Sequence, residues 1–154
     1  MRYNGAVRIA ASVLFAALAL AGCGNDVDVE LVWGGPPDAA PGGAVSTDGF
    51  ASFQQEVDEV WERSPAIAAG IFLRLDERTA TRTTIDAKAG PEGGGDQIVA
   101  VTLDGLADDS VRTERWTLGF DEGENGVYAL TGALREFRCH EGRGHQDFAG
   151  EACT

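Results

Sequence analysis

The chain has 154 residues, with 12 basic and 25 acidic side chains and a formal net charge of −13. Binding to phosphate groups requires clustered basic side chains, so this balance argues against nucleic acid as a partner. The length suits one domain with a modest core and is too short for two ordinary domains.

The first 22 residues are expected to form a signal peptide. Arg2 and Arg8 give a positively charged start, and residues 9–20 are apolar apart from one serine. This run is shorter than the ~20 apolar residues that a membrane-spanning helix needs. We therefore expect residues 1–22 to be removed as a targeting segment.

The tetrad Leu20-Ala21-Gly22-Cys23 ends this segment and resembles the lipobox of bacterial lipoproteins. The resemblance implies cleavage before Cys23 and attachment of lipid, with acyl chains such as palmitate, through the cysteine sulfur. Two or more acyl chains give stable membrane attachment. We expect a lipoprotein on the extracytoplasmic face of the cell membrane; the alternative is a plain signal peptide with a cysteine nearby.

Removal of residues 1–22 leaves 10 basic and 25 acidic side chains, a net charge of −15. This charge favours general solvation of an exposed, exported domain over a dedicated site for cations or basic ligands.

Two cysteines remain if Cys23 is acylated, and we expect Cys139 and Cys153 to form a disulfide. An exported location is oxidising enough to preserve the bond. A closed loop of this size contributes about 3 kcal/mol in the chain-entropy account. Free thiols or a metal site are the alternatives.

Residues 23–47 are expected to be the lipid anchor and a mostly flexible tether, because the stretch 34–43 is rich in Gly and Pro. Apolar and polar residues alternate over 27–33, which indicates a possible short strand. The folded domain is expected to span 48–154.

An amphipathic helix is predicted over 48–63, because apolar side chains recur there on one helical face: Phe50, Phe53, Val57, Val60 and Trp61. Thr47 or Asp48 can cap its start, and Pro65 lies beyond its end.

Strand patterns follow the helix. The alternation of Ile71, Leu73 and Leu75 and the Thr-rich stretch 78–86 predict the first strand region. The stretch 97–104 is apolar on both faces, which is typical of a central strand.

Two further strands are predicted at 112–120 and 127–138, joined as a hairpin by Asn125-Gly126. The first has Trp116, Leu118 and Phe120 on one face. The second has Tyr128, Leu130 and Leu134 on one face and Phe137 on the other.

These elements predict an α+β domain in which one N-terminal helix packs on an antiparallel sheet of about four strands, with a C-terminal loop closed by the disulfide. The element order resembles the cystatin or NTF2-like arrangement.

The segment 138–148, Arg-Cys-His-Glu-Gly-Arg-Gly-His-Gln-Asp-Phe, followed by a terminal cysteine, resembles the C-terminal signature of small exported bacterial proteins of uncharacterised activity. The resemblance covers about the last 40 residues and implies secretion and a disulfide, without a mechanism.

The same tail contains candidate metal ligands or a His-carboxylate catalytic pair: His140, Glu141, His145 and Asp147. The alternative is structural. In that interpretation Gly142-Arg143-Gly144 lets the chain reverse, His145 and Asp147 satisfy backbone groups, and Phe148 packs at the edge of the core.

Three functions are therefore open. The sequence favours a membrane-anchored structural or interaction module that binds an extracytoplasmic protein or small ligand, with no cofactor. The second is a carrier with an apolar cavity between the faces of Trp61 and Trp116. The third is a metal-binding or hydrolytic site in the tail. The chain lacks the GxSxG, P-loop and GxGxxG motifs, so no enzymatic activity is expected.

Overall fold

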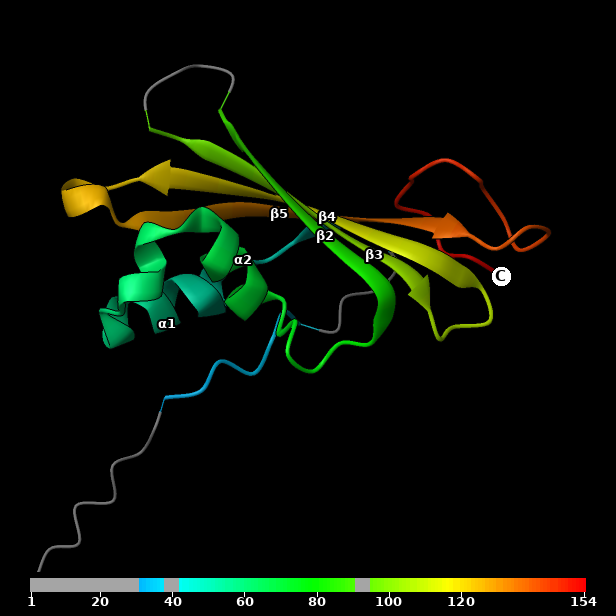
Figure 1. The fold of residues 1–154 in the computed structure, drawn as a ribbon, viewed down its shortest axis with the longest axis horizontal. Coiled ribbons are helices and arrows are strands. Elements are labelled where there is room, and N and C mark those ends of the chain that lie inside the picture. Colours follow the sequence, from blue (N-terminus) through cyan, green and yellow to red (C-terminus); the bar gives the residue numbers. More distant parts are fainter. Residues whose placement is uncertain (1–30, 38–41, 91–94) are drawn as a thin grey trace, which may run out of the picture. The chain divides into compact units, whose positions relative to one another are not determined.

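The computed structural model describes residues 31–37, 42–90 and 95–154. Within these residues, two α-helices cover one face of a five-stranded antiparallel sheet (Figure 1). The elements in chain order are β1 (Gly43–Val45), α1 (Asp48–Val57), the 3-10 helix η1 (Val60–Arg63), α2 (Pro65–Phe72), β2 (Ala80–Ala89), β3 (Gln97–Leu106), β4 (Val111–Glu122), the 3-10 turn η2 (Glu124–Gly126) and β5 (Tyr128–Cys139). The predicted α+β class is confirmed.

The strands lie in the order β1-β5-β4-β3-β2. Strands β2 to β5 form a meander of successive antiparallel neighbours, and β1 pairs with the free edge of β5 through Ala44 and Leu134. The open sheet therefore has β1 at one edge and β2 at the other.

The prediction of one helix over 48–63 is wrong in its second half. Helix α1 ends at Val57 because Asp58 adopts a left-handed backbone conformation, with φ 43° and ψ 56°. A new 3-10 helix then starts after Glu59, whose N–H donates to Glu62 Oε2 over 2.9 Å. This capping box satisfies backbone donors at a second helix start, which competes with continuation of the first helix.

The strand predicted from Ile71, Leu73 and Leu75 is also wrong, because residues 65–72 form α2. Ser64 Oγ accepts a hydrogen bond from the N–H of Ile67, and Pro65 follows at the first helical position. A serine cap followed by proline is a strong helix start, and it overrides the short apolar alternation further along.

The predicted strand regions at 78–86, 97–104, 112–120 and 127–138 correspond to β2, β3, β4 and β5, and the Asn125-Gly126 turn joins the last two as expected. The sheet has a fifth strand, β1, which lies within the stretch predicted as tether. Three residues carry too little pattern to be identified as a strand, and β1 exists because β5 supplies its hydrogen-bond partners.

One predicted face in β5 is wrong. The pairing of β4 with β5 shifts between Gly119 and Phe120, where a β-bulge interrupts the alternation. Leu130 is therefore buried with Phe137 on the helix side, whereas Leu134 lies on the opposite face and is 41% exposed.

Of the possible strand at 27–33, residues 27–30 lie outside the described residues, and 31–33 are not a strand. Trp33 instead joins the core. Its Nε1 donates to the carbonyl of Phe72 over 2.8 Å, and its ring packs at 5.2 Å from that of Phe50. The segment 31–37 is therefore part of the fold and more than a tether.

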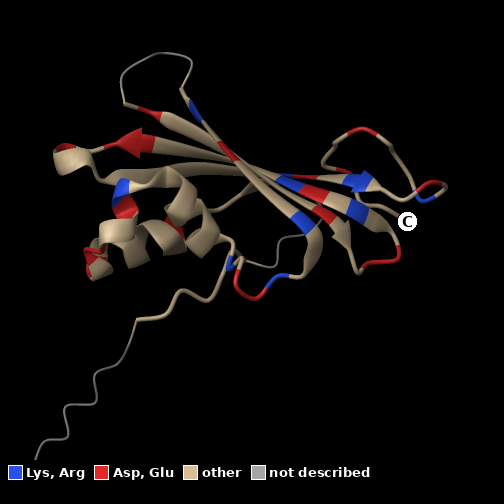
Figure 2. Ribbon diagram, viewed as in Figure 1, with Lys and Arg blue, Asp and Glu red and all other residues tan. Residues whose placement is uncertain are grey.

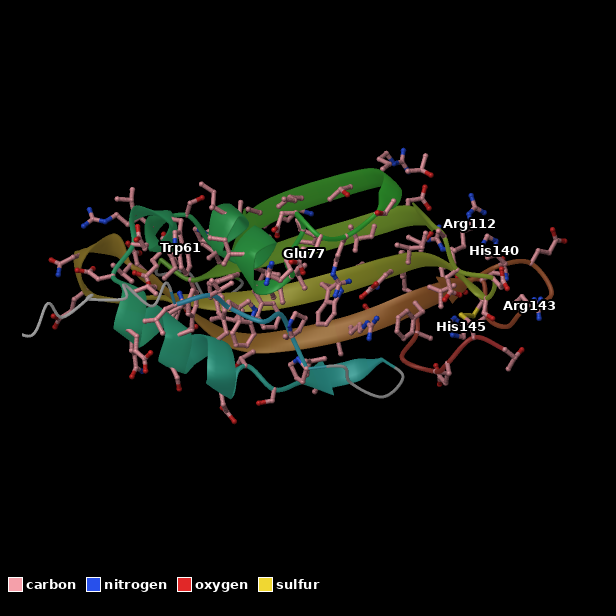
Figure 3. All side chains as sticks on the ribbon, turned by 90° about the horizontal axis from the view of Figure 1, so that it is seen from below. Trp61, Glu77, Arg112, His140, Arg143 and His145 are labelled. Atoms are coloured by element: carbon pink, nitrogen blue, oxygen red, sulfur yellow. A yellow bond between two sulfur atoms is a disulfide. The ribbon has the colours of Figure 1, made fainter. Side chains whose placement is uncertain are left out.

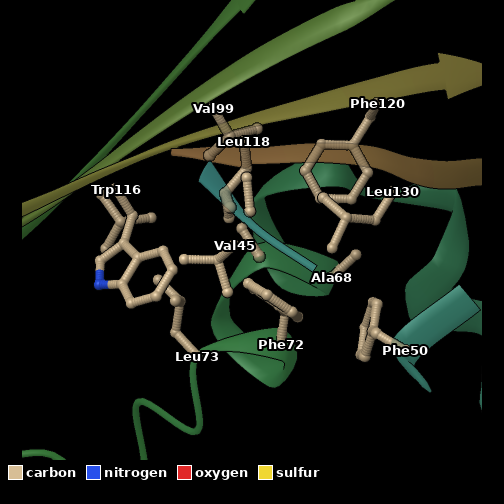
Figure 4. Packing of buried hydrophobic residues seen from close by; sticks show 13 residues of the cluster. Val45, Phe50, Ala68, Phe72, Leu73, Val99, Trp116, Leu118, Phe120 and Leu130 are labelled. Carbon is tan, nitrogen blue, oxygen red and sulfur yellow. The ribbon is translucent and has the colours of Figure 1, made fainter. Parts of the chain in front are cut away.

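The core lies between the helices and the sheet (Figure 4). Aromatic rings dominate its helical side, and Val99, Val101, Leu118 and Phe120 form its sheet side. Phe50 and Phe72 are fully buried. Apolar burial of this kind is the main stabilising term of the domain.

Candidate functional site

A partly open pocket of about 490 Å³ lies between α1, η1 and the start of β5. Pockets for small ligands typically have volumes of ~300–1,000 Å³. The lining combines two carboxylates, two amides, a phenol and small apolar side chains: Asp58, Glu62, Gln54, Gln55, Tyr128, Ala51, Val127 and Ala129. None of these lining residues is basic, so the full charges that a ligand meets there are negative.

The turn after α1 positions both carboxylates of the pocket. Asp58 is one of the residue types that tolerate the left-handed conformation seen here. The chain then reverses into η1, where the hydrogen bond from Glu59 fixes one oxygen of Glu62. Glu62 is only 3% exposed, so its carboxylate is held in the pocket wall and not in bulk water.

Gln54 fixes α1 against β5 and forms another part of the lining. Its Nε2 donates to the carbonyl of Tyr128 over 2.9 Å, and its Oε1 accepts from the N–H of Leu130 over 3.2 Å. Strand β1 pairs with β5 only from Ala133 onward, so the amide of Gln54 takes the place of a strand neighbour at the start of β5. The pocket is thereby held by backbone groups of the sheet.

Charge is unevenly distributed over the domain. Acidic residues gather around α1, η1 and η2, whereas most arginines lie toward the opposite end of the sheet (Figure 2). The acidic end includes the pocket, so the surrounding charge adds to that of Asp58 and Glu62 in attracting a cation.

A buried ion-pair cluster lies on the helix side of the sheet, centred on Glu114. Arg78 Nη1 donates to both carboxylate oxygens of Glu114 over 3.1 Å, and Arg135 Nε donates to Oε1 over 2.7 Å. The indole N–H of Trp116 also donates to Glu114. Glu114 is 4% exposed, so its charge depends on these partners.

No sequence pattern points to this cluster. Its members are separated by 36 and 21 residues along the chain and follow no motif. Within β4 the one available signal is an acidic residue, Glu114, at a position whose neighbours Trp116 and Leu118 on the same face are buried. A carboxylate at a core-facing position requires a cationic partner.

The Cys139–Cys153 disulfide is present and closes the C-terminal loop, with Cα atoms 5.4 Å apart. The loop also pairs with the sheet, because Phe137 and Ala149 exchange backbone hydrogen bonds of 2.8 and 3.0 Å. The C-terminal segment therefore continues along the same edge of β5 that β1 occupies.

His145 lies inside this loop, near the disulfide and away from Trp61 (Figure 3). Its Nδ1 is 2.8 Å from the carbonyl oxygen of Asp147, and its Nε2 is 3.0 Å from that of Glu151. These two carbonyls, that of Glu151 foremost, raise the pKa of His145 above its ordinary value. The histidine therefore holds the loop backbone together, as the structural interpretation predicted for His145.

The structure does not bring His140, Glu141, His145 and Asp147 together as a ligand set. Within the described ranges, the one group of at least three potential ligand atoms within 4.8 Å is that of Cys139, His145 and Cys153. The two sulfur atoms of this group are bonded to each other. Both nitrogens of His145 face backbone carbonyls, so the geometry favours a structural role for the tail over metal binding or catalysis.

Phe148 packs on the sheet, but not at the edge of the core. Its ring lies under the guanidinium carbons of Arg115, at 4.0 Å, and Arg138, at 4.5 Å. Both arginines belong to the face of the sheet opposite the helices, because they alternate with the buried Glu114 and Phe137 along their strands. The loop is thus attached to the uncovered face by cation–π contacts.

The space between Trp61 and Trp116 is filled by aromatic rings. Phe50 lies 6.0 Å from Trp61 and 5.3 Å from Phe72, which in turn lies 6.0 Å from Trp116. This packing weighs against a carrier cavity at that place and favours the surface pocket.

Cys23 and the segment 1–22 lie outside the described residues. In the part of the chain that the structure describes, no helix has the length and hydropathy needed to cross a membrane.

We found no family model that matches the chain, and no curated protein or solved structure that is significantly similar to it.

Proposed function

We propose that the chain is a lipid-anchored, extracytoplasmic binding module that accepts a cationic group of its ligand, an ammonium or guanidinium, in the pocket between α1, η1 and β5. The observation that supports this function is the pocket lining, which contains two carboxylates and no basic side chain. No catalytic step and no cofactor are part of the proposal.

The burial of Glu62 makes the pocket selective for charge. A carboxylate that is 3% exposed has lost much of its hydration, and a cation beside it restores part of the lost free energy. The attraction between two charges is stronger in such a site than at an open surface because the effective dielectric constant is lower.

The remaining lining residues suit an organic cation better than a bare metal ion. Tyr128 contributes an aromatic ring, which attracts ammonium and guanidinium groups through its negative face. Gln55 offers an amide, and Ala51 and Ala129 leave room for methylene groups. A lysine or arginine side chain of a partner protein, or a small free amine, has this chemistry.

The N-terminal segment supports the membrane-anchored part of the proposal. Residues 1–22 have the composition of a signal peptide, and Leu20-Ala21-Gly22-Cys23 resembles a lipobox. The Cys139–Cys153 bond fits an oxidising, exported location. The helical layer followed by an antiparallel sheet also fits the cystatin or NTF2-like arrangement, which we include in the proposal as its finer description.

Calorimetric titration with spermidine, a small trivalent amine, tests the pocket. We expect the wild-type protein to bind this probe and Glu62→Gln to weaken binding about tenfold or more, because a charge–charge contact is lost. Glutamine keeps an oxygen that can accept the N–H of Glu59, so the variant retains the turn. Asp58→Asn should act in the same direction, since asparagine tolerates the left-handed conformation.

The matched control is Asp109→Asn, which removes one exposed negative charge from the turn between β3 and β4. It should bind spermidine as the wild type does. Equal weakening by all three variants would show that binding follows net charge alone and would overturn the pocket assignment. Absence of binding by the wild type would overturn it as well.

The anchor is tested separately by the intact mass of the full protein purified from membranes. We expect a chain that starts at Cys23 and carries diacylglycerol, with a gain of about 2 Da on reduction of the disulfide. The Cys23→Ala variant, which has no site for the lipid, should be absent from the membrane fraction. A mass equal to the uncleaved chain, or an unmodified Cys23, contradicts the anchor and leaves the pocket proposal unaffected.

A further inference from the structure

The two edges of the sheet differ in how much of their backbone is paired. At one edge, β1 and the Ala149 bridge both pair with β5, so that edge is covered along much of its length. At the other edge, β2 pairs with β3 over Ala80–Ala89 and has no second strand neighbour within the described residues. Ala80 is half-buried and the other nine residues of β2 are exposed.

An open edge of this length has a specific chemistry. In an antiparallel ladder, alternate residues direct their N–H and C=O groups toward one neighbour, and the intervening residues direct theirs the other way. Half of the residues of β2 therefore present backbone donors and acceptors away from β3. The strand contains no proline, so nothing in its backbone prevents the addition of another strand.

We infer that β2 pairs with β2 of a second copy of this chain, antiparallel and about a two-fold axis at Thr84, so that two five-stranded sheets join into one. This interface goes beyond the proposed function and does not rest on it, because none of the pocket residues belongs to β2.

Backbone geometry restricts the register of such a pair. A residue whose backbone groups point outward must face an outward residue of the other copy. Two identical antiparallel strands satisfy this only when one residue lies directly opposite the same residue of the other copy. The two-fold axis then lies midway between these two residues, and we name the axis after that residue. Charge then selects among the possible positions of the axis.

An axis at Thr84 places Arg82 of each copy directly opposite Asp86 of the other, which gives two pairs of opposite charge. It also pairs Ala80 with Lys88, so almost the whole strand takes part. Directly opposed residues of opposite charge stabilise a strand pair, and like charges destabilise it.

The neighbouring registers are less favourable. An axis at Ile85 sets Arg82 against Lys88 twice, and an axis at Arg82 or Asp86 sets that residue against itself. An axis at Ala87 pairs Asp86 with Lys88 but leaves only half of the strand overlapping. Thr84 alone combines opposed charges with full overlap.

The packing of the faces agrees with this register. In the register of β2 with β3, Arg82 lies opposite Asp104 and Asp86 lies opposite Ala100. All four residues are on the face away from the helices. Ile85 pairs with the buried Val101 and so lies on the helix side, where it is 42% exposed. A two-fold axis perpendicular to the sheet keeps both helical layers on one side and places Ile85 opposite Thr83 of the other copy.

Cysteine cross-linking of the full chain in intact cells tests the register. In Thr84→Cys the two introduced residues face each other, with Cβ atoms about 5 Å apart, and oxidation with copper-phenanthroline should link them. In the control, Ala80→Cys, the two residues are about 27 Å apart along the strands and should not link. Both variants retain Cys23 and the native disulfide.

Mass spectrometry of the cross-linked material should identify a peptide pair joined through residue 84. The inference is overturned if Thr84→Cys yields no more linked dimer than Ala80→Cys. Because Thr84 is exposed, the substitution leaves the core intact.

A charge exchange provides the second test, in the Thr84→Cys background. Arg82→Asp creates two pairs of like charge across the axis, and we expect the cross-link yield to fall roughly threefold or more. Adding Asp86→Arg restores opposite charges across the axis, and the yield should return. The intramolecular pair of Arg82 with Asp104 is lost in both variants, and the pair of Asp86 with Lys88 is lost only in the double variant. Recovery in the double variant therefore cannot come from these intramolecular pairs and is specific to the interface. A yield that stays low in the double variant contradicts the register.

Discussion

His145 has a role that depends on its protonation state. A carbonyl oxygen only accepts hydrogen bonds, and a neutral imidazole has a single N–H, so only the charged ring can donate to both Asp147 and Glu151. The backbone carbonyls of Glu151 and Asp147, with smaller contributions from their carboxylates, raise the pKa of His145 above 6.5. The folded pKa therefore exceeds the unfolded one. The resulting stabilisation is complete below the unfolded pKa and is lost as the pH rises through the folded pKa.

Replacement of His145 by Gln should reveal this dependence. Glutamine does not titrate, so the difference in Tm between wild type and variant should be largest near pH ~5 and should shrink by pH ~8. Thermal unfolding followed by circular dichroism, with the disulfide intact, measures the difference. A gap that stays constant over this range would mean that the ring acts only through its shape.

The sequence predicts the structural role of some single residues and not of others. The disulfide of Cys139 and Cys153 follows from counting cysteines in a chain whose start predicts export, and the structural role of His145 follows from the glycines around it. The partners of Glu114 could not be predicted, because Arg78 and Arg135 reach it only when the loop after α2 and strand β5 meet β4.

At the scale of elements, the Glu114 cluster connects three parts of the fold: the segment before β2, β4 and β5. Arg78 also donates from Nε to the carbonyl of Leu73 at the end of α2, over 2.8 Å. The cluster thereby links the helical layer to the sheet beyond the apolar core.

Glu114→Ala should destabilise the domain by about 3 kcal/mol, because two partly buried guanidinium groups lose their counter-ion. The control is Glu136→Ala, whose carboxylate pairs with Arg115 on the uncovered face at 2.8 Å and with greater exposure. We expect it to cost about 1 kcal/mol or less. Urea unfolding of both variants measures the free energies. Similar losses for the two would indicate that the buried cluster has no special contribution.

The elements that the sequence predicts correctly are those whose patterns are local. The alternation in 112–120 and the Asn125-Gly126 turn contain all that is needed for the β4–β5 hairpin. In contrast, β1 depends on a strand far along the chain, and the separation of α1 from η1 depends on one left-handed residue, Asp58. The start of α2 was present in the sequence as Ser64-Pro65, but the apolar run after it also fits a strand.

At the scale of the whole molecule, the net charge, −13 for the full chain and −15 without residues 1–22, opposes folding through self-repulsion. The Debye length falls from ~30 Å at 0.01 M salt to ~10 Å at 0.1 M, so added salt screens repulsion between distant acidic groups. Buried pairs such as Arg135–Glu114 are screened less.

Sodium chloride added over this range should therefore raise the Tm of the protein. Differential scanning calorimetry at fixed pH gives the dependence. If salt instead lowered the Tm, attractive ion pairs at the surface would outweigh the repulsion.

The fold class was predictable because helical periodicity comes first in the chain and strand alternation follows it. The order of strands was not, since no local pattern shows that β1 lies beside β5. The meander leaves two free edges, β2 and β5, and β1 pairs with β5 through contacts that form only in the folded domain.

The position of β5 between β1 and β4 has a consequence during synthesis. Gln54 reaches the backbone of Leu130 across 76 residues, and β1 has no partner until β5 is made. The helical layer is therefore synthesised long before the strand that holds α1, and the part of its surface that packs on β5 stays unburied for that interval. A ribosome that stops before codon 128 releases a chain that has β3 and β4 but lacks Leu130 and the backbone partners of Gln54, so α1 has lost its place on the sheet. We expect such a chain to be a substrate for chaperones and proteases instead of a smaller working domain.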